Sequence, residues 1–141
     1  MPYQIVGGLA ARAHGASRPL YDIDLYMPFS NPRWRDFLED IDPYVVWGPK
    51  AVVEGAWDLT YLKANYHGQK IEIGDTADLK IQSSMTGEWV KQVIDFETSI
   101  AKSLLDCEIK VMPVDQLIAY KRLLGRDVDQ QDVRELTFIY S

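Results

Sequence analysis

Two aspartates one residue apart, Asp22 and Asp24, are the residues of this sequence best suited to chemistry. In an extended strand successive side chains point to opposite faces, so both carboxylates share one face while Ile23 and Leu25 share the other. Like charges this close raise one carboxyl pKa unless a cation lies between them. Hard divalent ions such as Mg²⁺ bind carboxylate oxygens and keep waters and substrate phosphates as further ligands. The pair therefore predicts a site for metal-dependent phosphoryl or nucleotidyl transfer.

A glycine pair, Gly7 and Gly8, precedes the aspartates. It follows a short apolar segment that reads as a strand, and it precedes a helix-forming run from Leu9 to His14. The free N–H groups at a helix N-terminus after a glycine turn suit a phosphate. We therefore predict a strand, a glycine turn and a short helix, followed by a second strand from Leu20 to Met27 that carries the two aspartates.

The combined pattern resembles the signature of the nucleotidyltransferase superfamily, whose fold is shared with polymerase beta. The string Val6-Gly-Gly-Leu-Ala-Ala-Arg-Ala-His-Gly15, followed by Ser17-Arg18 and Tyr21-Asp22-Ile-Asp24, resembles the small bacterial branch of that superfamily. This branch includes antibiotic nucleotidyltransferases and nucleotidyltransferase-like toxins and antitoxins. The resemblance implies an α/β (α+β) fold, with a small mixed β-sheet and helices mainly on one side.

The resemblance also implies a third carboxylate, flanked by apolar residues on another strand. Residues 57–66 alternate as a strand, and His67-Gly68 turns the chain into a second strand over residues 70–73. Glu72 of that second strand is the favoured third carboxylate. Asp75 and Asp78 remain alternatives, because a bulge or a register shift could bring either of them forward.

The resemblance assigns roles to these residues. Asp22, Asp24 and Glu72 would be catalytic and would hold Mg²⁺ or Mn²⁺. The aspartates would bind the metal that carries the triphosphate, and Glu72 would help to hold a second metal and take the proton of the acceptor hydroxyl. Gly7 and Gly8 would let the backbone approach the phosphates of the nucleotide without a side chain in the way.

Arg18 and Lys121 are the predicted nucleotide-binding cations. The guanidinium fork of Arg18 can pair with phosphate oxygens, and a surface ion pair is the alternative. Lys121 falls on the apolar stripe of a helix predicted over residues 115–124 and closed by Gly125. Its ammonium group either reaches water while its stem packs, or it reaches a phosphate or a site carboxylate.

The other elements are read from periodicity and turn residues. They are a helix that begins at Asn31-Pro32 with an apolar stripe of Trp34, Phe37, Leu38 and Ile41, a strand from Tyr44 to Trp47 bounded by Gly48-Pro49, a helix from about Glu88 to Leu105, and a strand from Glu108 to Met112. For residues 88–105 the alternative is a strand containing Val90 before a shorter helix. Asp129 and Asp132 are predicted to be structural, as the acids of a helix start.

The histidines and the cysteine are not predicted to act in catalysis. His14 is a single histidine on a short helix, which favours a packed or hydrogen-bonded side chain, and His67 falls in the hairpin turn. Neither has the spacing of a zinc ligand. Cys107 has no partner for an internal disulfide, so a packing or partly exposed thiol is predicted.

Composition and charge are those of an ordinary globular chain. Its 141 residues are enough for a single domain, residues 1–141, that buries about two thirds of the surface of the unfolded chain. Hydrophobic residues at 47% and charged residues at 26% indicate neither disorder nor a membrane span. The formal charge of −6 argues against a general nucleic-acid-binding surface. The N-terminus lacks the pattern of a secretory signal, which predicts a cytoplasmic location.

These features together predict a Mg²⁺-dependent nucleotidyltransferase. It would move an NMP, with AMP as the first choice, from an NTP to a hydroxyl group of a small molecule, a protein or an RNA, a reaction of the EC 2.7.7 type. The alternative is a non-catalytic nucleotidyltransferase-like component of a toxin–antitoxin pair, or another partner-binding protein. Because no sizeable second domain is apparent, the acceptor is expected at an open cleft, at a homodimer interface or on a protein partner.

Overall fold

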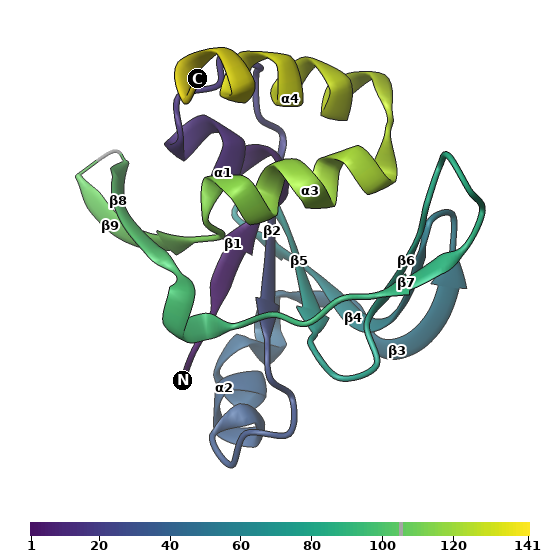
Figure 1. Cartoon of the computed structure of the whole chain (residues 1–141). Helices are drawn as coiled ribbons and strands as arrows, with labels where there is room; N and C mark the ends of the chain where they lie inside the picture. Colours follow the sequence, from purple (N-terminus) through teal and green to yellow (C-terminus); the bar gives the residue numbers. More distant parts are fainter. Residues whose placement is uncertain (105) are drawn as a thin grey trace.

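The described residues, 1–104 and 106–141, form a mixed nine-stranded sheet and four α-helices in the computed structural model of the protein (Figure 1). The strands are β1 (Gln4–Val6), β2 (Asp22–Met27), β3 (Val45–Glu54), β4 (Trp57–Tyr66), β5 (Gln69–Asp75), β6 (Lys80–Gln82), β7 (Trp89–Lys91), β8 (Ile100–Leu104) and β9 (Cys107–Val111). The helices are α1 (Gly7–Ala13), α2 (Trp34–Ile41), α3 (Val114–Leu124) and α4 (Asp127–Ile139), with 3₁₀ turns at Asp42–Tyr44 and Phe96–Thr98.

The strand order puts β2 and β5 side by side near the middle of the sheet. The order is β7-β6-β4-β5-β2-β1-β9-β8, and β3 pairs with β4 outside this path. The pairs β2–β5 and β1–β9 are parallel, whereas the other pairs are antiparallel. Strand β4 pairs with three neighbours, because its start contacts β6 and its end contacts β5 while β3 runs along it. The sheet is therefore mixed, as predicted.

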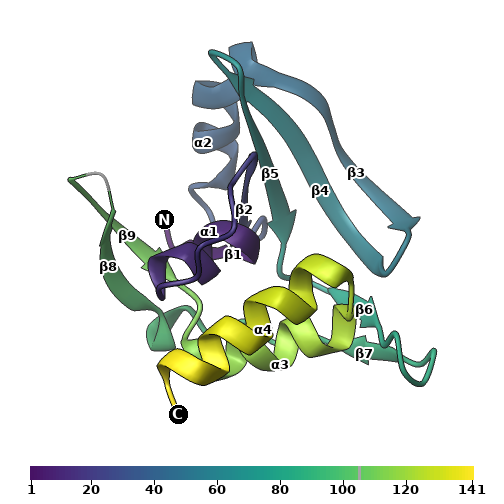
Figure 2. The ribbon, with the colours of Figure 1, turned by 90° about the horizontal axis from the view of Figure 1, so that it is seen from above.

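Helices α1, α3 and α4 lie together on one side of the sheet, and α2 lies on the other (Figure 1 and Figure 2). Ala10 of α1, Leu117 of α3 and Leu136 of α4 belong to one buried apolar core. The apolar residues of α2 pack instead on a second core that contains Leu62 and Ile73. The predicted fold class, with helices mainly on one side, is therefore confirmed.

The apolar stripe of α2 packs on the sheet as its spacing predicts. The ring of Trp34 stacks on that of Phe29, with centroids 3.7 Å apart. The helix begins at Trp34 rather than at Pro32, because Asn31 Oδ1 accepts a hydrogen bond from the N–H of Arg33 in a turn that precedes it. The helix was therefore predicted correctly, and its first turn was placed too early.

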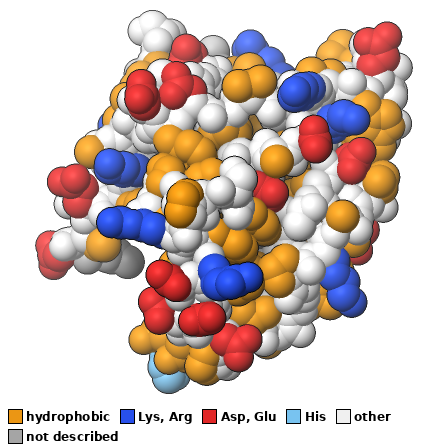
Figure 3. Space-filling model, turned by 90° about the horizontal axis from the view of Figure 1, so that it is seen from below, with side chains coloured by type: hydrophobic (Ala, Val, Ile, Leu, Met, Phe, Trp, Pro, Cys, Tyr) orange, Lys and Arg blue, Asp and Glu red, His pale blue; other side chains and the backbone are white. Residues whose placement is uncertain are grey.

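The outer face of α2 is acidic, with Asp36, Glu39 and Asp40 exposed. Figure 3 views the molecule from this side. Among the described side chains on this face, acidic and basic groups are interspersed, and no continuous basic area extends across it.

Strand β3 is longer than predicted. It was expected to end at Trp47, but it continues through Gly48-Pro49 to Glu54. Its second half pairs with β4 across a tight turn, with Glu54 opposite Trp57, and shifts of register on both sides of Trp47 absorb the irregular segment. Proline and glycine in this strand mark a bulge instead of a boundary.

The helix predicted over residues 88–105 is wrong. Residues 88–104 form β7, a 3₁₀ turn and β8, and residue 105 lies outside the described residues. The alternative that placed Val90 in a strand is correct in that respect, although no α-helix follows it in the described part of this segment. The pairing of β7 with β6 and of β8 with β9 overrides local helix propensity.

Helices α3 and α4 form a pair joined by a tight connection. Gly125, with φ of +62°, closes α3 as predicted, and its N–H donates to the carbonyl of Lys121. The next residue, Arg126, caps α4, and its N–H donates to the carboxylate of Asp129 in the first turn. Of the helices within the described ranges, none is both long and apolar enough to cross a lipid bilayer.

Candidate active site

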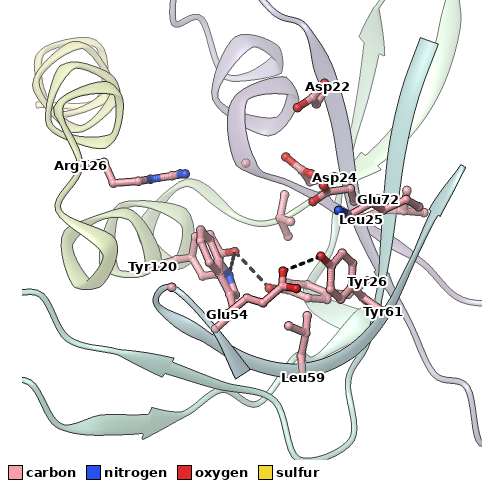
Figure 4. A pocket seen from close by; sticks show the side chains of 16 residues that line it. Asp22, Asp24, Leu25, Tyr26, Glu54, Leu59, Tyr61, Glu72, Tyr120 and Arg126 are labelled. Carbon is pink, nitrogen blue, oxygen red and sulfur yellow. Dashed lines mark hydrogen bonds between the residues drawn. The ribbon is translucent and has the colours of Figure 1, made fainter. Parts of the chain in front are cut away.

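The register between β2 and β5 brings three carboxylates to one place (Figure 4). The two strands are parallel and pair Asp24 with Glu72, so these side chains leave neighbouring strands on the same face. Asp22 lies two residues before Asp24 on β2 and points to that face as well. The structure therefore brings together the three residues that the sequence suggested as metal ligands.

The two alternative third carboxylates lie elsewhere. Asp75 is an odd number of positions along β5 from Glu72, so it points to the other face of the sheet. Its Oδ1 accepts hydrogen bonds from the backbone N–H groups of Phe29 and Ala77. Asp78 is exposed in the following loop, with φ of +54°. Of these three acids, Glu72 is the one that faces Asp24.

The carboxylates line a pocket of about 500 Å³. Its other walls come from β2, β3, β4, β5, α3 and the N-cap of α4. They include four aromatic residues, which are Tyr26, Trp57, Tyr61 and Tyr120. The hydroxyl groups of Tyr26 and Tyr120 are 3.0 Å apart, and Tyr61 donates to Glu54 Oε2 at 3.0 Å. The pocket thus joins a charged edge to a largely aromatic interior.

The environment of the site disfavours the charged form of the Asp24 carboxyl group. Burial, followed by the charges of Glu72 and Asp22, raises the pKa of Asp24 to about 7. Burial and the charge of Asp22 also raise the pKa of Glu72, and the nearby ammonium group of Lys63 opposes that effect. A carboxylate cluster with raised pKa values favours either a proton or a cation between its members. The site is therefore prepared to bind positive charge.

The donor set fits Mg²⁺ or Mn²⁺ that arrives with a phosphate ligand. Within residues 1–104 and 106–141, no three His, Cys, Asp or Glu side chains lie close enough together to hold a metal ion by themselves. Protein-bound Mg²⁺ is commonly held by one or two carboxylates and completes its shell with waters and substrate phosphates. Asp22, Asp24 and Glu72 offer the hard oxygen ligands for such a site, and a triphosphate would offer the rest.

Position 7 requires glycine, because the backbone there lies close to the side chain of Asp24. It begins α1 with φ of +64°, and a Cβ at this position would lie 2.8 Å from Asp24 Oδ2. A Cβ on Gly8 would lie 2.8 Å from Arg18 Nη2 and 2.9 Å from the side chain of Leu20. Gly7 also lines the pocket. The glycine pair thus makes room for the side chains of Asp24, Arg18 and Leu20, a close packing that the sequence did not reveal.

Replacing Gly7 by alanine should destabilise the protein by about 2–4 kcal/mol, since a left-handed backbone and a clash with Asp24 add together. The matched control is Gly87→Ala. Gly87 has φ of +74°, and a Cβ added there would meet no atom within 4 Å, so this variant tests the backbone cost alone. Denaturant unfolding of both variants measures the difference. Equal losses for the two variants would show that contact with Asp24 has no effect.

Lys121 lies inside the protein instead of in the pocket. Its side chain is 1% exposed, and its ammonium group lies 2.9 Å from Asp132 Oδ2 and 3.4 Å from Asp129 Oδ1. Neither predicted role applies, because the ammonium group reaches neither water nor the carboxylates of β2 and β5. Asp129 and Asp132 are fully buried. Asp129 takes part in the start of α4, as predicted, because its carboxylate accepts a hydrogen bond from the N–H of Arg126. Asp132 pairs instead with Lys121 and Arg18.

Arg18 is also paired within the protein. Its Nε and Nη2 donate to the two carboxylate oxygens of Asp132 at 3.2 and 2.9 Å. Burial alone would raise the pKa of Asp132, but the hydrogen bonds from Arg18 and Lys121 lower it. Arg18 lies next to Gly8 and does not line the pocket formed by the described residues. The ion pair, which was the alternative, is therefore the arrangement that the structure shows.

Two cations of the pocket were not predicted. Lys63 lies opposite Glu72 on β4, and Arg126 reaches the pocket from the start of α4. The position of Lys63 follows from the hairpin, because a two-residue turn fixes which residues of its strands are opposite. The signal for Arg126 was weaker. Arg126 follows the glycine that closes α3 and lies three residues before Asp129, which is the spacing of an N-cap residue and an acid that contacts it in the first helical turn.

The histidines and the cysteine are placed as predicted. His14 is buried, its Nε2 lies 2.7 Å from the carbonyl oxygen of Met112, and burial lowers its pKa. His67, with φ of +49°, forms the hairpin turn between β4 and β5. Cys107 is an exposed thiol at the start of β9. None of the three lines the pocket that the described residues form.

Comparison with known protein structures identifies the fold of the chain. No protein-family profile and no curated protein sequence matches the chain. The chain is similar to the crystal structure of a candidate nucleotidyltransferase from Thermotoga maritima, with 16% identity and a TM-score of 0.70 over 95% of this chain and 80% of that chain. It is also similar to the lincosamide antibiotic adenylyltransferase LnuA with lincomycin bound, with 14% identity and a TM-score of 0.61 over 97% of this chain and 86% of that chain.

The protein therefore has a nucleotidyltransferase fold, as the glycine pair and the two aspartates predicted. Identities of 14% and 16% establish the fold alone. What the pocket does is a separate question, because one fold carries many activities and the site decides between them.

Proposed function

We propose that the protein is a metal-dependent nucleotidyltransferase that moves an NMP from an NTP to a hydroxyl group. The observation behind this proposal is that Asp22, Asp24 and Glu72 line one edge of the same pocket in a nucleotidyltransferase fold. Burial, followed by the charges of Glu72 and Asp22, raises the pKa of Asp24 to about 7, and a cation bound beside these acids would favour their charged form. Perturbed acids in a pocket are candidates for a functional site.

Asp22 and Asp24 would hold the cation that accompanies the triphosphate, and Glu72 would help to hold a second. When bound, Mg²⁺ or Mn²⁺ neutralises phosphate charge and stabilises the entering and leaving oxygens. Gly7, which carries no side chain, leaves room for the Asp24 carboxylate at the edge of the pocket. The residues of the pocket thus separate into a metal-binding edge and an interior for the organic parts of the substrates.

The chemical step is a substitution at the α-phosphorus. The acceptor hydroxyl oxygen forms a bond to this phosphorus, the bond between the phosphorus and the pyrophosphate oxygen breaks, and pyrophosphate leaves with the electron pair. Glu72 takes the proton of the hydroxyl group. Burial and the charge of Asp22 raise the pKa of Glu72, which brings it closer to that of a useful base at neutral pH.

ATP is the proposed donor, and a small molecule with a hydroxyl group is the proposed acceptor. The similar structure of LnuA is described as an adenylyltransferase with an antibiotic bound, which supports both choices. The pocket offers apolar and aromatic surface from Trp57 and Tyr61, with the polar groups of Glu54 and Lys63 beside them. Small-molecule sites combine such surfaces with a few polar groups that fix orientation.

The test is transfer of label from α-labelled ATP, GTP, CTP or UTP with Mg²⁺ to candidate acceptors, with release of pyrophosphate as a second measure. The variant that combines Asp22→Ala with Asp24→Ala should lose transfer by at least roughly 10³-fold. The combination of Asp36→Ala with Asp40→Ala removes the same charge from the exposed face of α2 and should keep activity. Full activity after loss of Asp22 and Asp24 would reject the mechanism.

A partner-binding protein without activity makes a different prediction. A ligand that binds only the native state raises the melting temperature, so thermal unfolding with each NTP, with and without Mg²⁺, distinguishes the two functions. The proposed enzyme should show a shift that requires both Mg²⁺ and an NTP. The absence of such a shift with all four nucleotides would favour the partner-binding function.

A further inference from the structure

Five charged side chains alternate in sign between the segment before β2 and the start of α4. Arg18 pairs with Asp132, Asp132 with Lys121, Lys121 with Asp129, and Asp129 with Arg126. The three central side chains are 0–1% exposed, whereas the side chains of Arg18 and Arg126 are 21% and 52% exposed. The series therefore passes through the interior and reaches solvent most openly at Arg126.

Arg126 reaches solvent in the pocket of the carboxylates. It lines the same pocket as Asp22 and Asp24. Figure 4 shows its guanidinium group extending from the connection between α3 and α4 toward the side of the pocket where the aspartates lie. A positive group thus faces the proposed metal site from another element of the fold.

The guanidinium group of Arg126 is held in place on two sides. Its Nε lies 2.6 Å from Asp129 Oδ2, and its Nη2 lies 3.2 Å from Asp129 Oδ1. The centre of the group also lies 5.2 Å from the ring centroid of Trp57, which is a cation–π distance. A guanidinium has five N–H donors, and the pair with Asp129 uses two, so within the described residues three remain for an anion.

Asp129 is itself fixed. It is fully buried, and Lys121 on the preceding helix holds it from the other side, with 3.4 Å between Lys121 Nζ and Asp129 Oδ1. Lys121 is shared between Asp129 and Asp132, so Arg126 is a second cationic partner of Asp129. The contact of Arg126 with Asp129 therefore orients an arginine at the pocket in addition to balancing charge.

We infer that Arg126 binds the β- and γ-phosphates of the NTP, and that Asp129 is the residue that positions it. This inference rests on the proposed nucleotidyl transfer. The carboxylates would hold the metal near the α-phosphorus at their edge of the pocket, so a cation on another wall would meet the distal phosphates. Arginine pairs with phosphate oxygens through its planar fork. Charge grows on the leaving pyrophosphate as its bond to the α-phosphorus breaks, and Arg126 stabilises that charge.

The test compares binding of MgATP and MgAMP, and of the corresponding GTP, CTP and UTP pairs, by calorimetry. Arg126→Gln should weaken NTP binding by roughly ten- to hundredfold, the scale of lost hydrogen bonds to charged groups, and leave NMP binding unchanged. The affinity of Arg126→Lys for the NTP should lie between those of the unaltered protein and Arg126→Gln, because lysine keeps the positive charge but loses the planar fork of donors. The matched control is Arg122→Gln, which removes an exposed arginine of α3 outside the pocket.

A comparison of two variants, Asp129→Asn and Asp132→Asn, tests whether Asp129 positions Arg126. Asp129→Asn and Asp132→Asn each remove one buried partner of Lys121, so both should lower the melting temperature. Only Asp129→Asn should also weaken NTP binding relative to NMP binding, because only Asp129 contacts Arg126. In the variant that combines Asp129→Asn with Arg126→Gln, the loss of NTP binding should be no larger than with Arg126→Gln alone.

The outcomes separate this inference from the proposed function. If the unaltered protein binds no NTP with Mg²⁺, both are overturned. If it binds an NTP and Arg126→Gln behaves like Arg122→Gln, or weakens NTP and NMP equally, the role of Arg126 is overturned and the proposed function stands. If Asp129→Asn and Asp132→Asn affect NTP binding equally, Asp129 is a structural residue only.

Discussion

Asp24→Asn should lower nucleotidyl transfer by roughly 10²–10³-fold and yet make the protein more stable above about pH 7. Burial, then Glu72 and Asp22, raise the pKa of the Asp24 carboxyl group to about 7 in the folded protein. Below about pH 4 this group is protonated in the folded and the unfolded chain, so it has no effect on stability. As the pH rises, the unfolded chain loses the proton first, and the free energy of unfolding falls.

Denaturant unfolding of the wild type and Asp24→Asn between about pH 4 and pH 8 measures this effect. The stability advantage of the variant should grow from near zero to a plateau of at most about 4 kcal/mol. Mg²⁺ should stabilise the wild type at the upper end of this range and have little effect on the variant. A difference that does not depend on pH would contradict the assignment of charge repulsion to Asp24.

The control for this comparison is Asp40→Asn, the same chemical change on the exposed face of α2. It should change the free energy of unfolding by no more than about 0.5 kcal/mol at every pH. Its nucleotidyl transfer should equal that of the wild type. A loss of activity in Asp40→Asn would show that removal of any acid from this chain has the effect attributed to Asp24.

Lys121→Met should lower the free energy of unfolding by about 3–5 kcal/mol, because each of two buried carboxylates loses its buried ammonium partner and keeps only one partly exposed arginine. The ammonium group of Lys121 is the shared partner of Asp129 and Asp132, and all three side chains are buried. Methionine keeps most of the volume, so loss of packing contributes little. A domain is stable by about 5–15 kcal/mol in total, so this change removes a large part of its stability.

Two further variants identify the cause of that loss. Arg122→Met removes the neighbouring cation on the exposed face of α3 and should change stability by about 0.5 kcal/mol or less. The triple variant Lys121→Met, Asp129→Asn, Asp132→Asn should recover part of the lost stability, because it removes the uncompensated charge as well. If the triple variant is less stable than Lys121→Met alone, hydrogen bonding rather than charge governs this cluster.

The parts of the fold that depend on local patterns could be predicted from the sequence. The alternation of Asp22 and Asp24 with apolar residues places both carboxylates on one face, and the structure agrees. The spacing of the α2 stripe and the role of Gly125 at the end of α3 were predicted for similar reasons. In each case the deciding contacts lie within a few residues of one another.

The parts that depend on distant contacts could not be predicted from these patterns. The segment 88–104 forms strands because β6 and β9 pair with it through backbone hydrogen bonds. Its own sequence does not indicate which strands will pair with it. The burial of Lys121 depends on carboxylates of the next helix, and the choice of Glu72 over Asp75 depends on the parallel register with β2. The roles of these residues in catalysis stay predictions that the variants above would test.

The parallel pairings have a consequence for how the protein is made. Glu72 meets Asp24 only after 48 further residues have been added, and Ile5 of β1 pairs with Val111 of β9. Arg126 follows later still. Because the ribosome adds about 5–20 residues per second, a nascent chain spends seconds with β2 and its two aspartates synthesised before β5 is available to pair with them. A prematurely terminated chain that ends before α3 would therefore carry the glycine pair and both aspartates and lack an assembled pocket.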